Sequence, residues 1–310
     1  MDMRKKEIFM KLYRTILFAP GNRERMLQKV GKAGADAVVL DLEDAVPADE
    51  KDSTRAALGA AVKTIAEEDG ADVFVRVNPL DDVTGFSIAC GPEDIAAVVQ
   101  PTLRGIVLPK AENPGQILAA DRLIRDAERA AGCEAGSIHL LAILENARGV
   151  EDAFAVASAD TGERRFQLAF GAGDYTNDLD VEWPRDEFTF DYPRSRIAVA
   201  SRSAGLEKPL DTVWIALDDQ EGLAASAVRC RALGMFGKFC IHPKQVEVVN
   251  HAFTPTREEV EKAREVVAAF EEATARGEAS VSVGGRMIDY PVVEAAEKVI
   301  ALAEDFGTKD

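Results

Sequence analysis

Short, nearly continuous apolar runs alternate with longer amphipathic segments along most of this chain. The runs are closed by turn residues and are rich in aliphatic side chains, which predicts strands buried on both faces of a parallel sheet. The eight predicted strands cover residues 15–19, 37–41, 73–77, 105–109, 140–145, 167–171, 213–216 and 237–241. The predicted helices cover residues 23–32, 51–67, 114–131, 148–157, 194–204 and 220–233.

Eight strands in alternation with helices predict an α/β protein built as a (β/α)₈ TIM barrel. We place this catalytic barrel at residues 12–252 of the 310-residue chain, within the size of a single barrel domain. A doubly wound sheet is the alternative, because the glycine-rich sequence from Gly171 resembles a dinucleotide loop. Thr176 replaces the third glycine of that pattern, which argues against it.

The pattern changes after the last predicted strand. Thr254 and Pro255 can begin a helix whose first turn carries Glu258 and Glu259. A glycine-rich loop and a last helix from Val292 follow. The resulting helical extension, residues 253–310, is too small for a robust core of its own. We expect it to pack on its own barrel or on a neighbouring subunit.

The net charge of −17 argues against nucleic acid and anionic membranes as partners. Residues 1–32 are the exception, with nine basic and three acidic side chains. This basic segment could hold a polyphosphate ligand, or it could be a solubilising terminus. No apolar signal follows the first charges, and the four cysteines form no CxxC pair, so we predict a cytoplasmic protein.

Two acids stand at the ends of neighbouring predicted strands: Glu145 closes one run and Asp174 follows the next. The carboxyl ends of barrel strands meet at one mouth, so these side chains should converge there. Two hard oxygen ligands with little else nearby predict a Mg²⁺ site that leaves positions open for substrate. Each acid alone could instead be a solvated strand end.

Arg76 lies inside an apolar run and needs a carboxylate partner, because an unpaired buried charge is costly. The partner could be Asp41 or Glu43 at the end of the second strand, or the carboxylate of a 2-oxo acid substrate. We count Arg76, Asp41 and Glu43 among the candidate catalytic residues. His242 follows the last strand without a second histidine at metal spacing, which favours a structural role.

An ordered set of motifs then identifies a family. The motifs are RTILFAPGN (14–22), DAVVLDLED (36–44), RVN (76–78), LPK (108–110), Glu145, FGAGD (170–174), IHP (241–243) and GRMIDYP (285–291). The chain resembles the citrate lyase β-subunit-like branch of the HpcH/HpaI aldolase superfamily, which includes malyl-CoA and citramalyl-CoA lyases. The resemblance covers nearly the whole chain and is specific for the family rather than for the substrate.

The resemblance implies a homotrimer or hexamer in which Glu145 and Asp174 hold Mg²⁺ and Arg76 binds the acid substrate. It implies CoA near the start of the chain, which gives Arg14, Arg25 and Lys32 a binding role. In similar CoA lyases the aspartate of the last motif, here Asp289, comes from an adjacent subunit and acts as acid or base. The absence of a histidine base after the second strand argues against aldol chemistry on free aldehydes.

The expected function is therefore Mg²⁺-dependent cleavage or formation of a 3-hydroxy-dicarboxylyl-CoA thioester, with glyoxylate, pyruvate or oxaloacetate as candidate 2-oxo acids. A β subunit of a multi-protein citrate lyase, acting on a carrier-protein thioester, is a second hypothesis. A malyl-CoA thioesterase and a catalytically idle binding protein are others. The sequence does not choose the acid, the direction of the reaction or the exact oligomeric state.

Overall fold

The computed structural model describes residues 11–80 and 90–309, and the chain divides into two compact units after Asn250. The first unit contains one curved sheet of seven parallel strands in the order β6-β5-β4-β3-β2-β1-β7. Its strands are β1 (Thr15–Pro20), β2 (Ala37–Asp41), β3 (Asp72–Arg76), β4 (Gly105–Leu108), β5 (His139–Leu144), β6 (Phe166–Phe170) and β7 (Lys238–Cys240).

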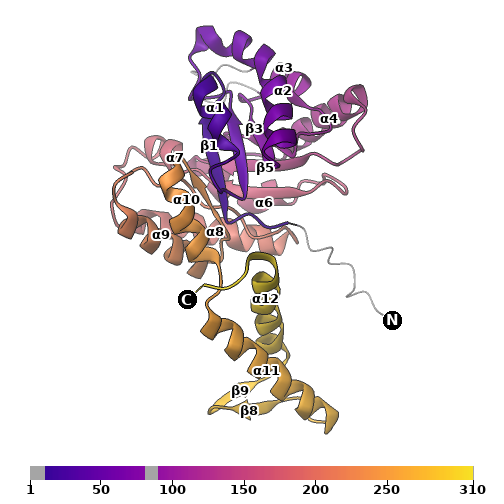
Figure 1. Cartoon of the computed structure of the whole chain (residues 1–310), viewed down its shortest axis with the longest axis vertical. Coiled ribbons are helices and arrows are strands. Elements are labelled where there is room, and N and C mark those ends of the chain that lie inside the picture. The colour runs from indigo at the N-terminus through magenta and orange to yellow at the C-terminus, as the bar shows by residue number, and fades with distance from the viewer. Residues whose placement is uncertain (1–10, 81–89, 310) are drawn as a thin grey trace. The chain divides into compact units, whose positions relative to one another are not determined.

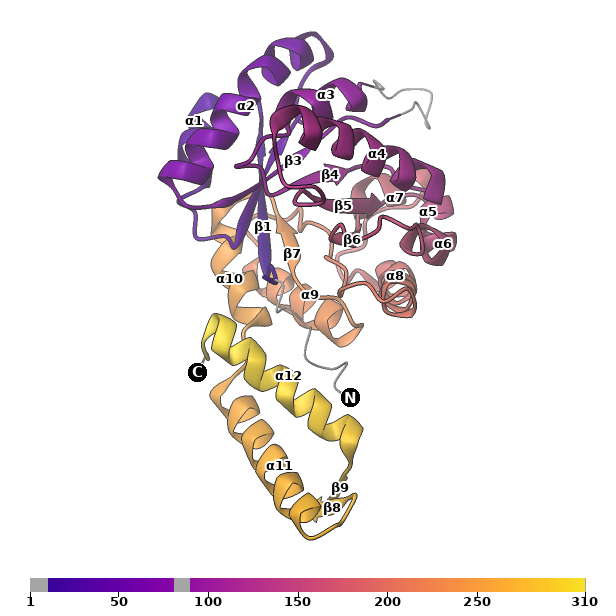
Figure 2. The same ribbon diagram turned by 90° about the vertical axis from the view of Figure 1, so that its right-hand side faces the viewer.

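Helices follow the strands and surround the sheet, as Figure 2 shows. They are α1 (Glu24–Val30), α2 (Lys51–Glu68), α3 (Gly91–Val98), α4 (Pro114–Ala131), α5 (Ala147–Glu151), α6 (Ala153–Ala157), α7 (Ala172–Asp178), α8 (Asp191–Ser203), α9 (Gln220–Ala232) and α10 (Pro243–Phe253). Short 3₁₀ turns cover Ala48–Glu50 and Phe188–Phe190. Within the described ranges, no helix combines the length and apolarity needed to cross a bilayer.

The core lies on the concave side of the sheet and takes side chains from every strand. Phe74 of β3 is fully buried there, and its ring meets Tyr13 and His139 edge to face at 5.5 and 5.4 Å between centroids. Val107, Leu141 and other inward residues complete this cluster. Alternate residues of a strand point to opposite faces, so the near-continuous apolar runs serve both this core and the helix layer.

The predicted strand at residues 213–216 is wrong. The chain instead pairs at Leu210 and Asp211, which form isolated parallel bridges to β6 and β7. Leu210 N–H donates to Leu168 O at 3.1 Å, and Asp211 N–H donates to Gly237 O at 2.9 Å. We call this two-residue connection the seam. Ile215, within the apolar run that suggested a strand, is half exposed on the surface. The hydrophobicity of this run is therefore not a sign of sheet pairing.

Two helix boundaries depend on local capping. The predicted helix 114–131 is found as α4, where Asn113 and Gln116 form a capping box and Gly132 ends the helix at φ 70°. The predicted helix 148–157 is divided at Asp152 into α5 and α6. The aligned apolar positions on both sides of Asp152 explain why a single helix was predicted.

The second unit is a helical hairpin with a small β-hairpin at its turn, shown in Figure 1. It contains α11 (Arg257–Ala275), β8 (Val281–Val283), β9 (Arg286–Ile288) and α12 (Tyr290–Phe306). The N-cap of α11 is Thr256, because its side chain and that of Glu259 form a reciprocal capping box. The prediction that Thr254 caps this helix is therefore wrong, and the last helix begins two residues before Val292.

Candidate active site

The candidate site lies at the carboxyl edge of the sheet, where the alignment of β2 with β3 brings two charged residues together. Asp41 is the last residue of β2 and pairs with Arg76, the last residue of β3. Arg76 Nε and Nη2 donate to the two Asp41 oxygens at 2.7 and 2.6 Å, and Nη1 lies 2.9 Å from Glu43 Oε2. The protein therefore supplies carboxylate partners for Arg76. Asp41 engages two of the five guanidinium N–H groups, so three remain for other contacts.

Glu145 is buried directly after β5, and its position depends on two neighbouring loops. Its Oε1 accepts a hydrogen bond of 2.7 Å from the Lys110 backbone N–H. A methyl group at Gly171, after β6, would lie 2.6 Å from Glu145 Oε2, so only a glycine leaves room for this carboxylate. Asp174 lies in the first turn of α7 and is 40% exposed, which makes it the solvent-facing member of the predicted metal pair.

The site carries an excess of negative charge. Burial, followed by repulsion from Glu43 and Asp174, raises the pKa of Glu145 to about 8, against the opposing effect of Lys110 and Arg76. Burial also raises the pKa of Glu43 above its ordinary value. Burial would raise the pKa of Asp41 as well, but Arg76 and two backbone N–H groups outweigh it and lower that pKa.

This donor set suits a small divalent cation. Glu145 and Asp174 offer hard oxygen atoms, and their unfavourable mutual charge is what a cation would relieve. Within residues 11–80 and 90–309, no group of three or more His, Cys, Asp or Glu side chains forms a closed metal cage. Mg²⁺ sites commonly use one or two protein carboxylates and leave the other positions to water or substrate.

Lys110 is a site residue that the sequence analysis named within the LPK motif but gave no role. Its Nζ contacts Glu43, lies 2.9 Å from Asp174 Oδ2 and lies 3.8 Å from Asp44 Oδ1. Burial opposes its charge, but the surrounding carboxylates raise its pKa above the ordinary value. Lys110 is the polar residue that follows β4, so the strand-end rule that selected Glu145 could have selected it too.

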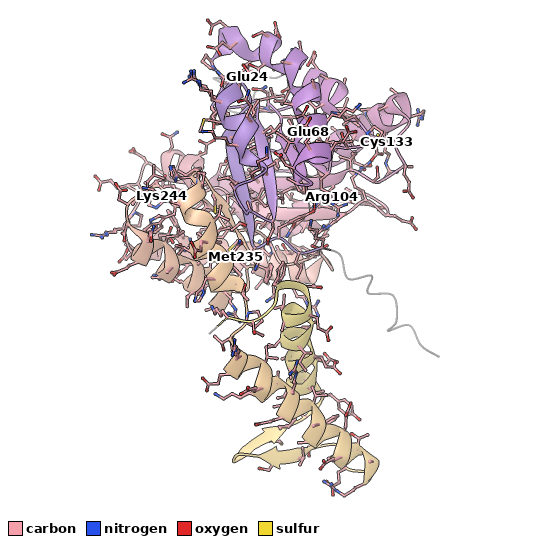
Figure 3. The ribbon with its side chains drawn as sticks, in the orientation of Figure 1. Glu24, Glu68, Arg104, Cys133, Met235 and Lys244 are labelled. Carbon is pink, nitrogen blue, oxygen red and sulfur yellow. The ribbon has the colours of Figure 1, made fainter. Side chains whose placement is uncertain are left out.

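The three predicted CoA contacts lie in different places. Arg14 precedes β1 and binds Asp36 through Nε and Nη2 at 3.0 and 2.6 Å, at the amino edge of the sheet. Two residues labelled in Figure 3 help to locate the edges of the sheet. Arg104 directly precedes β4, at the amino edge, and Glu24 begins α1, beyond the carboxyl end of β1. Arg25 is exposed in the first turn of α1, on the side of the candidate site. Arg25 is therefore better placed than Arg14 to contact a ligand bound at the candidate site.

Lys32 is exposed beyond the end of α1 and pairs with Asp69 at 3.2 Å. The CoA-binding role of all three basic residues remains a prediction. His242 follows β7, and its Nδ1 accepts a hydrogen bond of 3.1 Å from Lys244 N–H. The structural role of His242 remains a prediction.

Asp289 belongs to the second unit and caps α12. Its Oδ1 accepts a hydrogen bond of 3.4 Å from Val292 N–H. The catalytic role of Asp289 and its delivery to a neighbouring barrel remain predictions.

Comparison with known proteins identifies the family. The model of the HpcH/HpaI aldolase/citrate lyase family matches residues 14–243, and a model described as a C–C bond lyase of the TIM-barrel fold matches residues 189–308. The chain belongs to the HpcH/HpaI aldolase/citrate lyase family and is an enzyme of that family. The match includes every strand of the sheet and both residues of the predicted metal pair.

Named relatives cover nearly the full length of the chain. The citrate lyase subunit beta of Leuconostoc mesenteroides subsp. cremoris is 38% identical over 94% of each chain. The L-malyl-CoA/beta-methylmalyl-CoA lyase of Cereibacter sphaeroides is 31% identical over 93% of each chain. The structure of CitE from Mycobacterium tuberculosis in complex with magnesium, acetoacetate and coenzyme A has a TM-score of 0.74 and 28% identity, over 94% of this chain and 98% of that one.

Proposed function

We propose that this protein is a Mg²⁺-dependent carbon–carbon lyase that cleaves, or forms, a 3-hydroxy-dicarboxylyl-CoA thioester. The products of cleavage are an acyl-CoA and a 2-oxo acid. The observation that carries the proposal is one charged cluster at the carboxyl edge of the sheet. In it, Glu145 is repelled by Asp174 and attracted by Lys110 and Arg76. The named lyases among the relatives and the magnesium and coenzyme A bound to the CitE structure support it.

The residues fit a retro-Claisen cleavage. The substrate hydroxyl gives up its proton to a base and becomes the carbonyl of the 2-oxo acid, while the electrons of the broken C–C bond form a thioester enolate. Mg²⁺, held by Glu145 and Asp174, would lower the pKa of that hydroxyl and neutralise the adjacent carboxylate. Arg76 provides fixed positive charge for the acid, and Asp289 would protonate the enolate carbon.

Two variants of this reaction remain in the proposal. The 38% identical relative is a citrate lyase subunit, which favours a carrier-protein thioester as the second candidate substrate. Water could also attack the thioester, giving a thioesterase. Free CoA and an intact hydroxy diacid are the products of the thioesterase, whereas the lyase yields an acyl-CoA and a 2-oxo acid.

The test assays malyl-, citramalyl- and citryl-CoA in parallel, with Mg²⁺ and with EDTA, and identifies both products. We expect Glu145→Gln and Asp174→Asn each to abolish Mg²⁺-dependent cleavage while the fold remains intact, since neutralising two repelling acids does not destabilise the metal-free site. Glu68→Gln, an exposed acid on α2 marked in Figure 3, is the matched control. Full activity in EDTA would overturn the metal assignment, and absence of any acyl-CoA product would overturn the lyase.

A further inference from the structure

Lys110 contacts the acids of the candidate site with both its backbone and its side chain. Its backbone N–H donates to Glu145 Oε1 at 2.7 Å, and its Nζ contacts Glu43 and Asp174. One residue after β4 therefore reaches both predicted metal ligands. The side chain is largely buried, at 11% exposure, so these contacts are only weakly screened by water.

The backbone of Lys110 is held in an unusual conformation. Its φ is +53°, in the left-handed region that non-glycine residues rarely occupy. Such a conformation persists only where the surroundings favour it, and here it directs the Lys110 N–H at Glu145. A residue chosen only to turn the chain would be glycine, so the side chain itself has a use at this position.

The charges around Lys110 show what that use is. Two cations, Arg76 and Lys110, lie among five carboxylates, those of Asp41, Glu43, Asp44, Glu145 and Asp174. Arg76 is held by Asp41 at the end of β2 and by Glu43 in the loop that follows, whereas Lys110 Nζ lies 2.9 Å from Asp174 Oδ2. The Lys110 ammonium thus pairs with an oxygen of Asp174 that would otherwise be available to bind the metal.

We propose that Lys110 is the resident counter-cation of this site: its ammonium holds Asp174 in the metal-free enzyme and releases it when a divalent cation binds. The inference rests on the metal site of the proposed function. After release, the ammonium stays paired with Glu43, which keeps its charge at the same edge of the sheet. Metal and ammonium therefore compete for Asp174, and the lysine lowers the affinity of the site for metal.

The test measures Mn²⁺ binding to the full-length protein by electron paramagnetic resonance, so it needs no substrate and no turnover. Lys110→Met removes the competing charge, and we expect it to tighten Mn²⁺ binding by about tenfold or more. Lys110→Arg keeps a cation and should stay close to wild type. Lys63→Met, at an exposed position of α2, is the matched control and should not change the affinity.

Unchanged or weaker Mn²⁺ binding by Lys110→Met would overturn the counter-cation role. Lys110→Gln keeps hydrogen-bonding capacity without charge, so it gives the same readout if the methionine variant does not fold. Loss of Mn²⁺ binding in Glu145→Gln tests the metal site separately. Wild-type binding that depends on Glu145 but not on Lys110 would sink this inference and leave the proposed function standing.

Discussion

At the residue scale, Arg76 has the protein carboxylate partners that were one of its two predicted alternatives, and its contact with a substrate carboxylate remains a prediction. The sequence offered either a protein carboxylate or a substrate carboxylate as its partner. Asp41 takes two guanidinium donors in parallel, and Nη1 lies 2.9 Å from Glu43 Oε2. These protein contacts fix the plane of the guanidinium. The sequence predicts that Arg76 needs a carboxylate partner but does not choose among Asp41, Glu43 and a substrate.

Arg76→Lys tests that arrangement. An ammonium cannot reproduce two parallel hydrogen bonds to Asp41, so the lysine should neither hold its place nor bind a carboxylate in the same geometry. We expect 2-oxo acid binding to weaken by roughly 2–3 kcal/mol, as for a lost charge-assisted contact. Calorimetric titration with glyoxylate, pyruvate and oxaloacetate measures it. Unchanged affinity for all three acids would leave Arg76 as a structural partner of Asp41.

Gly171 gives a second prediction at this scale. Its φ of −116° is open to any residue, so its backbone does not require glycine. A Cβ there would lie 2.6 Å from Glu145 Oε2 and 2.7 Å from Ile143 Cγ2, so Gly171→Ala must displace the carboxylate. We expect Mn²⁺ affinity to fall by roughly tenfold to a hundredfold, in line with the cost of misplacing a site group. Gly173→Ala, whose Cβ meets no atom within 4 Å, is the control.

Equal Mn²⁺ affinities for Gly171→Ala and Gly173→Ala would mean that Glu145 does not hold the metal, or that it moves without cost.

At the scale of elements, the helices and strands that the sequence predicts correctly are those fixed by interactions between residues close together in the chain. β2 matches its predicted bounds because five consecutive buried residues define it, and α4 matches because its capping box and terminal glycine are local signals. The seam is too short to show a hydrophobic periodicity in the sequence. Its two residues are held by partners far along the chain, which no window of sequence reveals.

The partners of the seam are charged and fully buried. Asp211 accepts hydrogen bonds from Arg194 Nε and Nη2 at 2.8 and 2.9 Å and also contacts Lys238 Nζ. Glu187 joins Arg194 at 2.7 Å. These contacts connect α8 and β7 to the short stretch between β6 and β7. Because Asp211 is charged, the sequence pattern does not mark the seam as a strand, and the apolar run at residues 213–216 was predicted in its place.

Lys238→Met should expose how much the seam depends on this network. Removing one partner of a buried ionic group leaves uncompensated charge, which costs about 3–5 kcal/mol. We expect the free energy of unfolding to fall by that amount in chemical denaturation. Lys63→Met on the exposed face of α2 should stay within about 0.5 kcal/mol of wild type, as for other surface changes. A Lys238→Met protein as stable as wild type would show that Arg194 alone balances Asp211.

At the scale of the whole molecule, the question is which chain supplies the acid or base. The predicted metal ligands Glu145 and Asp174 lie in the first unit and Asp289 in the second. Asp289 also caps α12, so an alanine there would confuse a catalytic defect with a frayed helix. Asparagine caps a helix about as well as aspartate but cannot transfer the proton. Asp289→Asn therefore isolates the chemical role.

We expect Asp289→Asn and Glu145→Gln proteins to be inactive alone and to regain a fraction of wild-type activity when dissociated and reassembled together. In a mixed oligomer with shared sites, some sites combine the intact Glu145 and Asp174 of one chain with the intact Asp289 of another. Differently tagged chains, recovered together by sequential affinity steps, prove the exchange of subunits. Recovered activity means that the acid acts in trans, across a subunit boundary. Fully exchanged oligomers that stay inactive would mean that Asp289 serves its own barrel or takes no part in catalysis.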